Sequence, residues 1–181
     1  STPQNIRNSE KEVLNYNDAL KTLCEKINNK NTSISLNLIL IIHKQVMKDL
    51  LPIYEQGKFR QKPVVVNNPK TGQTIFLPPD VQDVEKLMKE LVDFVLVNKH
   101  KIDPLILAGI FHKQMVIIHP FIDGNGRTTR LAVKILLAQM GLNTFNLFSF
   151  ENYYNNSVTR YFQTVGEFGN YYEIKDKIAE C

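Results

Sequence analysis

The sequence of 181 residues contains no tryptophan, and its two cysteines, Cys24 and Cys181, lie far apart in the chain. A framework of disulfides needs more cysteines at closer spacing, so the sequence excludes a disulfide-stabilised scaffold. Neither cysteine has a histidine or a second cysteine at the spacing of zinc ligands, which argues against a structural zinc site. We therefore expect two reduced thiols, as in the reducing cytosol.

Long apolar segments are also missing. A helix that crosses a bilayer needs about 18 or more consecutive apolar residues. The most apolar stretch, residues 36–42, is interrupted by Asn37 and followed by His43 and Lys44. Residues 1–9 lack the basic and then apolar pattern of a secretory signal. The sequence thus predicts a cytoplasmic protein without a membrane partner.

Charge of either sign is sparse and dispersed. The 22 Lys and Arg against 18 Asp and Glu give a net charge of +4, without the dense basic stripe of a nucleic-acid-binding protein. A basic helical module that binds nucleic acid is therefore the weaker alternative, whereas a modest positive excess suits a ligand that bears phosphate. The length, with 43% hydrophobic and 22% charged residues, predicts one globular domain over residues 1–181.

What the sequence does contain is a series of helical periodicities, separated by Pro, Gly and Ser. Between the second and third of them, residues 62–76 combine β-branched side chains with a turn cluster at residues 67–72 and predict a β-hairpin. We expect an all-α fold, a helical bundle around one central buried helix, with this hairpin inserted. The expected helices span residues 10–28, 33–51 (capped by Ser33 or Ser35), 80–98, 103 to about 119, 125–140, 150–165 and 171–179.

Residues 119–130 carry several groups that are used in phosphate chemistry. Gly124 and Gly126 flank Asn125 where a helix begins, and glycine lets the backbone adopt a positive φ and approach a ligand closely. Unpaired amides at a helix N-terminus bind anions, especially phosphate. The sequence therefore predicts an anion nest formed by these three residues.

Three kinds of side chain accompany this nest. Arg127 and Arg130 lie three residues apart, hence on one helix face, and their guanidinium groups can fork onto phosphate oxygens. Asp123 can hold a Mg²⁺ ion that bridges phosphates, and His119 can accept a proton from an attacking hydroxyl near neutral pH. The helix continues as the apolar segment 131–138, so two arginines at its buried start are costly unless an anion meets them.

This stretch resembles the signature of the Fic family, His-x-Phe-x-Asp/Glu-Gly-Asn-Gly-Arg-x-x-Arg, and every fixed position matches. The resemblance covers about residues 33–165 and includes the turn at residues 57–60, the hairpin and the Pro78-Pro79 pair. It implies a Fic-type bundle in which the hairpin is a flap. It also implies an enzyme that uses Mg²⁺ and transfers AMP from ATP to a Tyr, Thr or Ser hydroxyl of a target protein.

The resemblance further implies a role for each residue of the motif. His119 is the implied general base, Asp123 the implied Mg²⁺ ligand, and Phe121 the anchor of the loop in the core. Arg127 would bind the β- and γ-phosphates, and Arg130 the γ-phosphate. The remaining implied residues are Gly124, Asn125 and Gly126 in the anion nest, Tyr161 beside adenine, and Gln73, Thr74, Ile75 and Phe76 in the flap that pairs with the target segment.

One residue distinguishes activities within the family. Relatives of the Doc type have Lys where this chain has Gly126, bind ATP in the reverse sense and act as kinases, so Gly126 favours AMP transfer. Relatives that use UTP or a choline-linked nucleotide carry the same motif, which leaves transfer of a different group open. The other alternative is a nucleotide-binding regulator that is non-catalytic or inhibited by a partner, although the intact His119 and Asp123 argue against lost chemistry.

Many Fic proteins are inhibited by a helix with the pattern Ser/Thr-x-x-x-Glu-Gly/Asn, whose Glu pairs with the second motif Arg. Only Glu151 of this sequence precedes Gly or Asn, and four residues earlier stands Leu147 rather than Ser or Thr. We therefore find no self-inhibitory motif in the sequence and expect Arg130 to be available to ATP. The restraint would then come from a separate antitoxin-like protein, from a preceding segment or from another mechanism.

Overall fold

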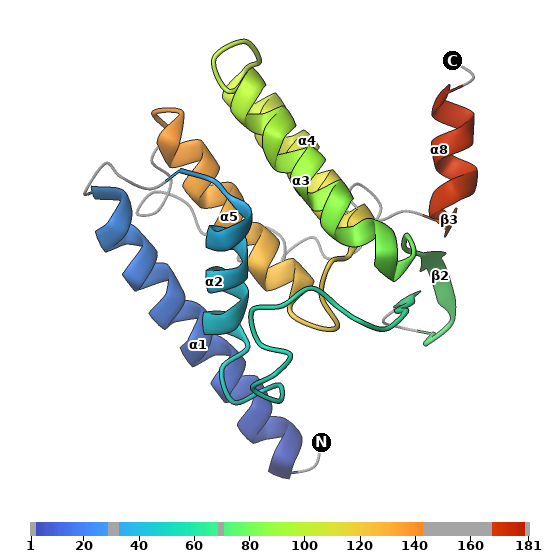
Figure 1. Ribbon diagram of the computed structural model, residues 1–181. Helices are drawn as coiled ribbons and strands as arrows, with labels where there is room; N and C mark the ends of the chain where they lie inside the picture. The colour runs from blue at the N-terminus through green and yellow to red at the C-terminus, as the bar shows by residue number, and fades with distance from the viewer. Residues whose placement is uncertain (1–2, 29–32, 69–70, 143–167, 180–181) are drawn as a thin grey trace.

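The structure is a computed structural model, and it describes residues 3–28, 33–68, 71–142 and 168–179. The chain is mostly helical and carries one small sheet (Figure 1). The elements are α1 (Pro3–Asn28), α2 (Leu36–Val46), β1 (Val66–Asn67), β2 (Thr74–Leu77), α3 (Val81–Asn98), α4 (Pro104–Ile118), α5 (Asn125–Gln139), β3 (Gly169–Asn170) and α8 (Tyr171–Ala179). The helix expected at residues 150–165 lies outside the described residues.

Helix α5 is the central helix, as its apolar sequence predicted. It packs against α4, α2 and α1 (Figure 1). Leu131, Ala132, Ile135 and Leu136 are all fully buried. Because burial of one large aliphatic side chain contributes about 1.5–3 kcal/mol, this packing firmly fixes the N-terminus of α5, where the motif lies.

Local capping signals set the starts of two helices. The Ser35 side chain accepts a hydrogen bond from the Leu38 amide at 3.2 Å and so begins α2. Asp103 accepts a hydrogen bond from the Leu105 amide at 2.9 Å and begins α4, whose first residue is Pro104. The start at Asp103 was predicted from the sequence, and of the two caps that the sequence left open for α2, Ser33 and Ser35, the structure uses Ser35.

Two helix bounds differ from the prediction. Helix α2 ends at Val46 rather than near Leu51, and Asp49 then adopts a φ of 56°, a left-handed conformation that an α-helix does not contain. Pro52 therefore follows the end of the helix and does not cause it. Helix α1 begins at Pro3, before residue 10, because the exposed polar residues 7–10 continue the helix without an apolar period.

The predicted hairpin is present, but its first strand is short. Strand β1 pairs antiparallel with β2 through Val66 and Phe76. The sequence predicted a strand from Pro63 onward, yet proline has no amide hydrogen to donate and residues 63–65 lie outside the ladder. On the other edge of β2, β3 pairs in parallel through Phe76 and Gly169. The sequence missed β3 because two residues are too few to show an alternating pattern.

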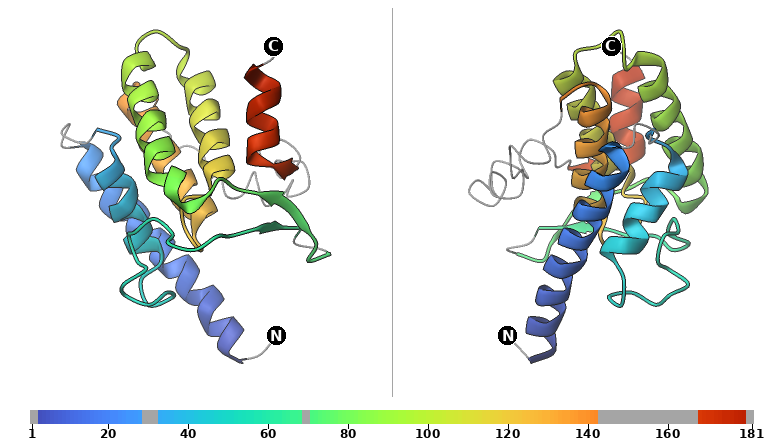
Figure 2. Two further views of the ribbon diagram at one scale, coloured as in Figure 1. Left: turned by 45° about the vertical axis from the view of Figure 1, so that its right-hand side comes forward. Right: turned by 90° about the vertical axis from the view of Figure 1, so that its left-hand side faces the viewer.

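Helix α8 confirms the helix predicted at residues 171–179 and lies beside the sheet (Figure 2). The Tyr172 hydroxyl donates a hydrogen bond to Asp83 Oδ2 at 2.6 Å and accepts one from the Asp80 amide at 3.1 Å. Asp80 directly precedes α3, and Asp83 lies in its first turn. Tyr172 therefore joins α8 to the start of α3, at the point where the chain leaves the hairpin.

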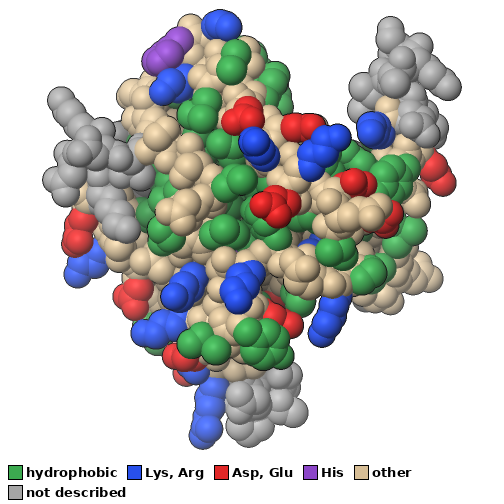
Figure 3. Space-filling view, viewed as in Figure 1, with side chains coloured by type: hydrophobic (Ala, Val, Ile, Leu, Met, Phe, Trp, Pro, Cys, Tyr) green, Lys and Arg blue, Asp and Glu red, His purple; other side chains and the backbone are tan. Residues whose placement is uncertain are grey.

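Basic and acidic side chains are interspersed on the face shown in Figure 3, and the described residues form no continuous basic stripe there. The dispersed charge of the sequence is thus dispersed on this face as well. Within the described ranges, no helix combines the length and the hydropathy that a membrane crossing requires.

Two histidines are buried in the helical core, His43 on α2 and His112 on α4. Burial lowers the pKa of each to about 4, partly opposed at His43 by a hydrogen bond to Asp123 and reinforced at His112 by Arg130. Both histidines are therefore neutral in the folded protein at pH 7. In the unfolded chain each would bind a proton below about pH 6.5, so the unfolded state gains protons first as the pH falls.

We therefore expect the free energy of unfolding to fall as the pH is lowered from about 7 to about 5, by up to ~1.4 kcal/mol per pH unit for each buried histidine. The free energy of unfolding of His112→Gln should fall less between these pH values than that of the wild type. His100→Gln, which changes an exposed histidine, should lose as much as the wild type. Urea unfolding at both pH values measures the difference, and equal losses in all three proteins would contradict the expectation.

Candidate functional site

The site begins where α4 ends at His119. This residue adopts φ 48° and ψ 58°, the left-handed conformation, while its amide still donates to the Met115 carbonyl at 3.1 Å. A side chain other than glycine occupies this region rarely, because its Cβ crowds the backbone. The turn stops the helix and directs the chain into the loop of residues 120–124, so the position of the His119 side chain follows from the end of a rigid helix.

A buried side-chain amide closes this loop. The Phe121 amide donates to Asn125 Oδ1 at 2.9 Å, and Asn125 Nδ2 donates to the Phe121 carbonyl at 2.8 Å. The Asn125 side chain therefore points into the protein. Any contribution of this residue to the predicted anion nest must come from its backbone amide.

Phe121 anchors the loop in the core, as the family resemblance implied. Its side chain is fully buried. Its ring stacks on His43 with centroids 3.8 Å apart and an interplanar angle of 4°, and it also contacts Phe59 at 5.8 Å. The loop is thus attached to α2 and to the turn that follows α2.

His43 adds two hydrogen bonds to the stacking. Its Nδ1 accepts the Gly57 amide at 2.9 Å, so the ring hydrogen lies on Nε2, which donates to the Asp123 carbonyl at 3.1 Å. The neutral imidazole that burial enforces is the state that makes both bonds. His43 therefore holds the Asp123 backbone in place without facing the pocket.

At Gly124 a side chain would be both strained and crowded. Its φ is 77°, and a Cβ built there would lie 2.5 Å from Met47 Sδ and 2.9 Å from Met47 Cγ. At Gly126, by contrast, a Cβ would meet only Arg130 Nη1, at 3.2 Å. The first glycine is thus required by the approach of the loop to α2, and the second leaves room beside the arginine.

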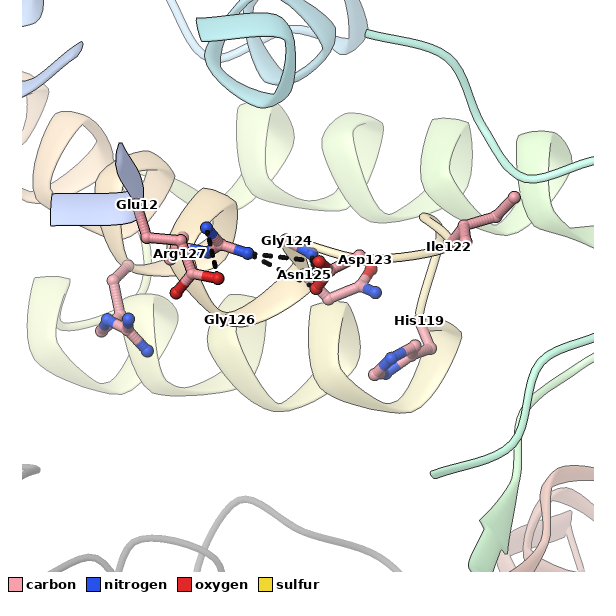
Figure 4. Close-up of a pocket in the computed structure, with 9 residues that line it drawn as sticks. Glu12, His119, Ile122, Asp123, Gly124, Asn125, Gly126 and Arg127 are labelled. Carbon is pink, nitrogen blue, oxygen red and sulfur yellow. Dashed lines mark hydrogen bonds and ion pairs between the residues drawn. The ribbon is translucent and has the colours of Figure 1, made fainter. Parts of the chain in front are cut away.

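The start of α5 opens into a pocket of about 370 Å³ (Figure 4), within the size range of small-molecule sites. It brings together most of the residues predicted from the sequence. Its lining residues are Glu12, His119, Ile122, Asp123, Gly124, Asn125, Gly126, Arg127 and Arg130. The flap residues Gln73, Thr74, Ile75 and Phe76 do not line it, and Tyr161 lies outside the described residues.

Each of the two arginines carries a buried donor that makes no hydrogen bond to a described residue. Arg127 Nη2 lies 3.4 Å from both carboxylate oxygens of Asp123. Arg127 Nη1 and Arg130 Nε are buried, and among the described residues neither has a hydrogen-bond partner. A buried donor without an acceptor costs about 1–3 kcal/mol, and more when it is charged. The arrangement is therefore suited to an anion that supplies the missing acceptors.

The neutral form of His119 suits a proton acceptor. Its pKa is lowered, mainly by burial and in addition by the charge of Arg60. A hydrogen bond to the Val116 carbonyl and the charge of Asp123 oppose this shift. Nδ1 lies 3.4 Å from the Val116 carbonyl, which favours the tautomer with its hydrogen on Nδ1. Nε2 is then the nitrogen with a free electron pair.

Glu12 is the pocket residue that the sequence did not reveal. It comes from α1, and its Oε1 lies 3.6 Å from Arg127 Nη1 (Figure 4). The sequence lacks the Ser/Thr-x-x-x-Glu-Gly/Asn pattern, yet an acidic side chain of this chain reaches Arg127, the first arginine of the motif. Glu12 does not fit that pattern, because Asn8 stands four residues before it and Val13 follows it. Only the packing of α1 against α5 reveals the contact, and the availability of Arg130 to ATP stays a prediction.

The pocket offers few ligands for a metal ion. Asp123 and Glu12 supply its carboxylates, and the described residues contain no cluster of three or more His, Cys, Asp or Glu side chains that could hold an ion. A cation here would therefore need oxygen ligands from another molecule as well.

The fold and the site define a class: a helical domain in which the glycine-flanked start of the central helix and its two arginines share a pocket with a histidine whose pKa is lowered by burial. The chain belongs to the Fic/DOC family, whose family model matches residues 33–137. It is 35% identical over 131 residues to the protein adenylyltransferase Fic of Nematostella vectensis and 33% identical over 134 residues to the protein adenylyltransferase fic-1 of Caenorhabditis elegans. The predicted family and the Fic-type helical fold are thus confirmed.

Solved structures agree with this assignment. Fic-1 from Caenorhabditis elegans matches with a TM-score of 0.63 at 26% identity, over 92% of this chain and 47% of that one. A Fic domain containing signaling protein from Bacteroides thetaiotaomicron matches with a TM-score of 0.61 at 26% identity, over 72% and 48%. The two curated relatives are matched over 72% of this chain, which spans only 29% and 24% of their own lengths.

Gly124 and Gly141 form a matched pair for a test of the loop. Both have a positive φ, 77° and 88°, but a Cβ at Gly141 meets nothing within 4 Å. We expect Gly141→Ala to lower the free energy of unfolding by about 1 kcal/mol through left-handed strain alone. Gly124→Ala should lower it by about 2–4 kcal/mol, because the new methyl group also overpacks Met47. Urea unfolding measures both, and equal losses would refute the contact with Met47.

Proposed function

We propose that this chain is the catalytic domain of a protein adenylyltransferase, which transfers AMP from ATP to a Tyr, Thr or Ser hydroxyl of a target protein. One observation carries the proposal: buried donors on Arg127 and Arg130 that make no hydrogen bond to a described residue share a pocket with the neutral His119. The curated relatives named as protein adenylyltransferases support the same chemistry.

In the proposed reaction, the target hydroxyl oxygen forms a bond to the α-phosphorus of ATP. The bond from that phosphorus to pyrophosphate breaks, and pyrophosphate leaves with the electron pair. His119 Nε2 accepts the hydroxyl proton. Because burial lowers the pKa of His119, the imidazole needs no deprotonation before it acts at neutral pH.

The start of α5 would bind the phosphates. The backbone amides of Asn125 and Gly126 lie at the positive end of the helix dipole, where anions are favoured, while the Gly124 amide donates to Asp123 Oδ1. Arg127 would bind the β- and γ-phosphates and Arg130 the γ-phosphate, which supplies acceptors to their unpaired donors. Negative charge that develops on the phosphates during transfer would then be stabilised by amides and guanidinium groups that are already in position.

Asp123 fits the role of a Mg²⁺ ligand together with the phosphates. Its side chain is 58% exposed at the edge of the pocket, and Mg²⁺ is commonly held by one or two carboxylates plus phosphate oxygens and water. When bound, the ion would neutralise phosphate charge. Asp123 keeps its carboxylate oriented through the Gly124 amide and Arg127.

The flap would position the target segment by strand addition, through residues Gln73 to Phe76. Strand β3 already occupies the outer edge of β2 at Phe76 and Leu77. Among the described residues no strand pairs with that edge at Thr74 and Ile75, so a target strand would be added there or would displace β3. Tyr161 stays a candidate contact for adenine.

Glu12 would restrain the enzyme. Its carboxylate competes with nucleotide phosphate for Arg127, and like charges placed together would repel each other. This restraint requires no separate antitoxin-like protein, which we retain as a second source of control. The restraint would be lifted whenever α1 moves Glu12 away from Arg127.

The proposed reaction is tested with Mg²⁺ and ATP labelled at the α- or the γ-phosphate, in the presence of cell lysate. We expect protein labelling from the α-label alone, and a loss of about 10²–10⁴-fold in His119→Ala, because a positioned general base contributes that much. His100→Ala, which changes an exposed histidine, is the control. Labelling from the γ-label alone would identify a kinase instead, and ATP binding without any labelling a non-catalytic regulator.

The restraint is tested with Glu12→Gln, which removes the charge and keeps the shape. We expect Mg-ATP to bind at least about fivefold more tightly than to the wild type, since an ion pair and a like-charge repulsion are both removed. Glu10→Gln, on an exposed position of the same helix, should bind as the wild type does. Isothermal titration calorimetry measures the three affinities, and identical values for all of them would exclude Glu12 as a competitor.

A further inference from the structure

Arg60 lies in the turn between α2 and the hairpin and is almost fully buried, at 2% exposure. It does not line the pocket. A buried cation is costly unless its donors are satisfied. Its hydrogen bonds therefore show which parts of the fold it connects.

Those hydrogen bonds reach two separate parts of the proposed active site. The Arg60 amide donates to the Pro120 carbonyl at 2.9 Å, and Nε donates to the His119 carbonyl at 2.9 Å. Nη2 donates to the Pro79 carbonyl and Nη1 to the Lys62 carbonyl, the latter at 3.4 Å. Lys62 precedes the hairpin and Pro79 follows it, so one side chain joins both ends of the flap to the catalytic loop.

The shape of the guanidinium group explains why this position holds arginine. Its planar fork presents several donors in fixed directions, whereas a lysine ammonium is a compact point charge without that fork. A lysine at position 60 could keep the charge but not hold three carbonyls from different segments at once. His43, which also supports the loop, bonds to Gly57 and Asp123 and to neither end of the hairpin.

We propose that Arg60 is a positioning residue that sets the flap at a fixed distance from His119, so that a target hydroxyl held by the flap reaches Nε2. The inference rests on the proposed function. Arg60 acts through the His119 backbone and the ends of the hairpin and touches no reacting atom. A displacement of about 1 Å between reacting groups can lower a rate about 10²-fold, whereas water, as an acceptor, needs no flap.

The test compares two acceptors in the wild type, Arg60→Lys and Arg60→Met, with Lys58→Met as a control on an exposed position of the same turn. Protein labelling from α-labelled ATP in cell lysate measures transfer to protein, and AMP release without lysate measures transfer to water. We expect the ratio of the rate of transfer to protein to the rate of transfer to water to fall about 10- to 100-fold in both Arg60 variants. The Kd for Mg-ATP should stay within about twofold of the wild type, since Arg60 lies outside the pocket.

An unchanged ratio in folded Arg60→Lys would overturn the proposal, as would an equal loss of ATP affinity and of both rates. Arg60→Lys decides the matter if Arg60→Met fails to fold. Amide hydrogen exchange supplies a readout that is independent of activity. Exchange should become faster in residues 74–77 and 119–123 together, with α5 unchanged; no such change in either segment also overturns the proposal. If the wild type labels no protein, the proposed function fails, and hydrogen exchange alone then decides the role of Arg60.

Discussion

The reciprocal hydrogen bonds between the Asn125 side chain and the Phe121 backbone are the constraint on which the site depends. They satisfy both polar backbone groups of a fully buried residue, each of which would otherwise cost about 1–3 kcal/mol. They also fold the loop so that Phe121 points inward while the first amides of α5 stay at the pocket. The Asn125 side chain thereby allows Phe121 to be buried while the start of α5 stays open to the pocket.

Two buried side chains outside the motif, His43 and Arg60, hold this loop in place. His43 bonds the Asp123 carbonyl and stacks on Phe121, and Arg60 bonds the His119 carbonyl. His43 is neutral because burial lowers its pKa, and that neutrality gives it one acceptor and one donor nitrogen. The twelve-residue motif therefore supplies most of the side chains that line the pocket, whereas α2 and the turn after it hold the loop in its shape.

The predictions that succeeded depended on neighbouring residues. Ser35 and Asp103 cap their helices within three positions, and the apolar periodicity of α5 directly reports its burial. What the sequence could not predict came from contacts across the fold. The packing of α1 against α5 brings Glu12 to Arg127, and β3 is too short to leave a pattern. Helix α2 ends at Val46, and the turn that follows contains the left-handed Asp49 without any glycine to mark it in the sequence.

The distances along the chain between the loop and its supports have a consequence for biosynthesis. His43 precedes its partner Asp123 by 80 residues, and Arg60 precedes His119 by 59. Since synthesis proceeds from the N-terminus, both supports leave the ribosome before the motif exists. When the ribosome reaches α5, the residues of both supports have therefore already been made, and the loop acquires its shape by docking on them. The motif residues are consecutive, but a chain that held them alone would lack both supports.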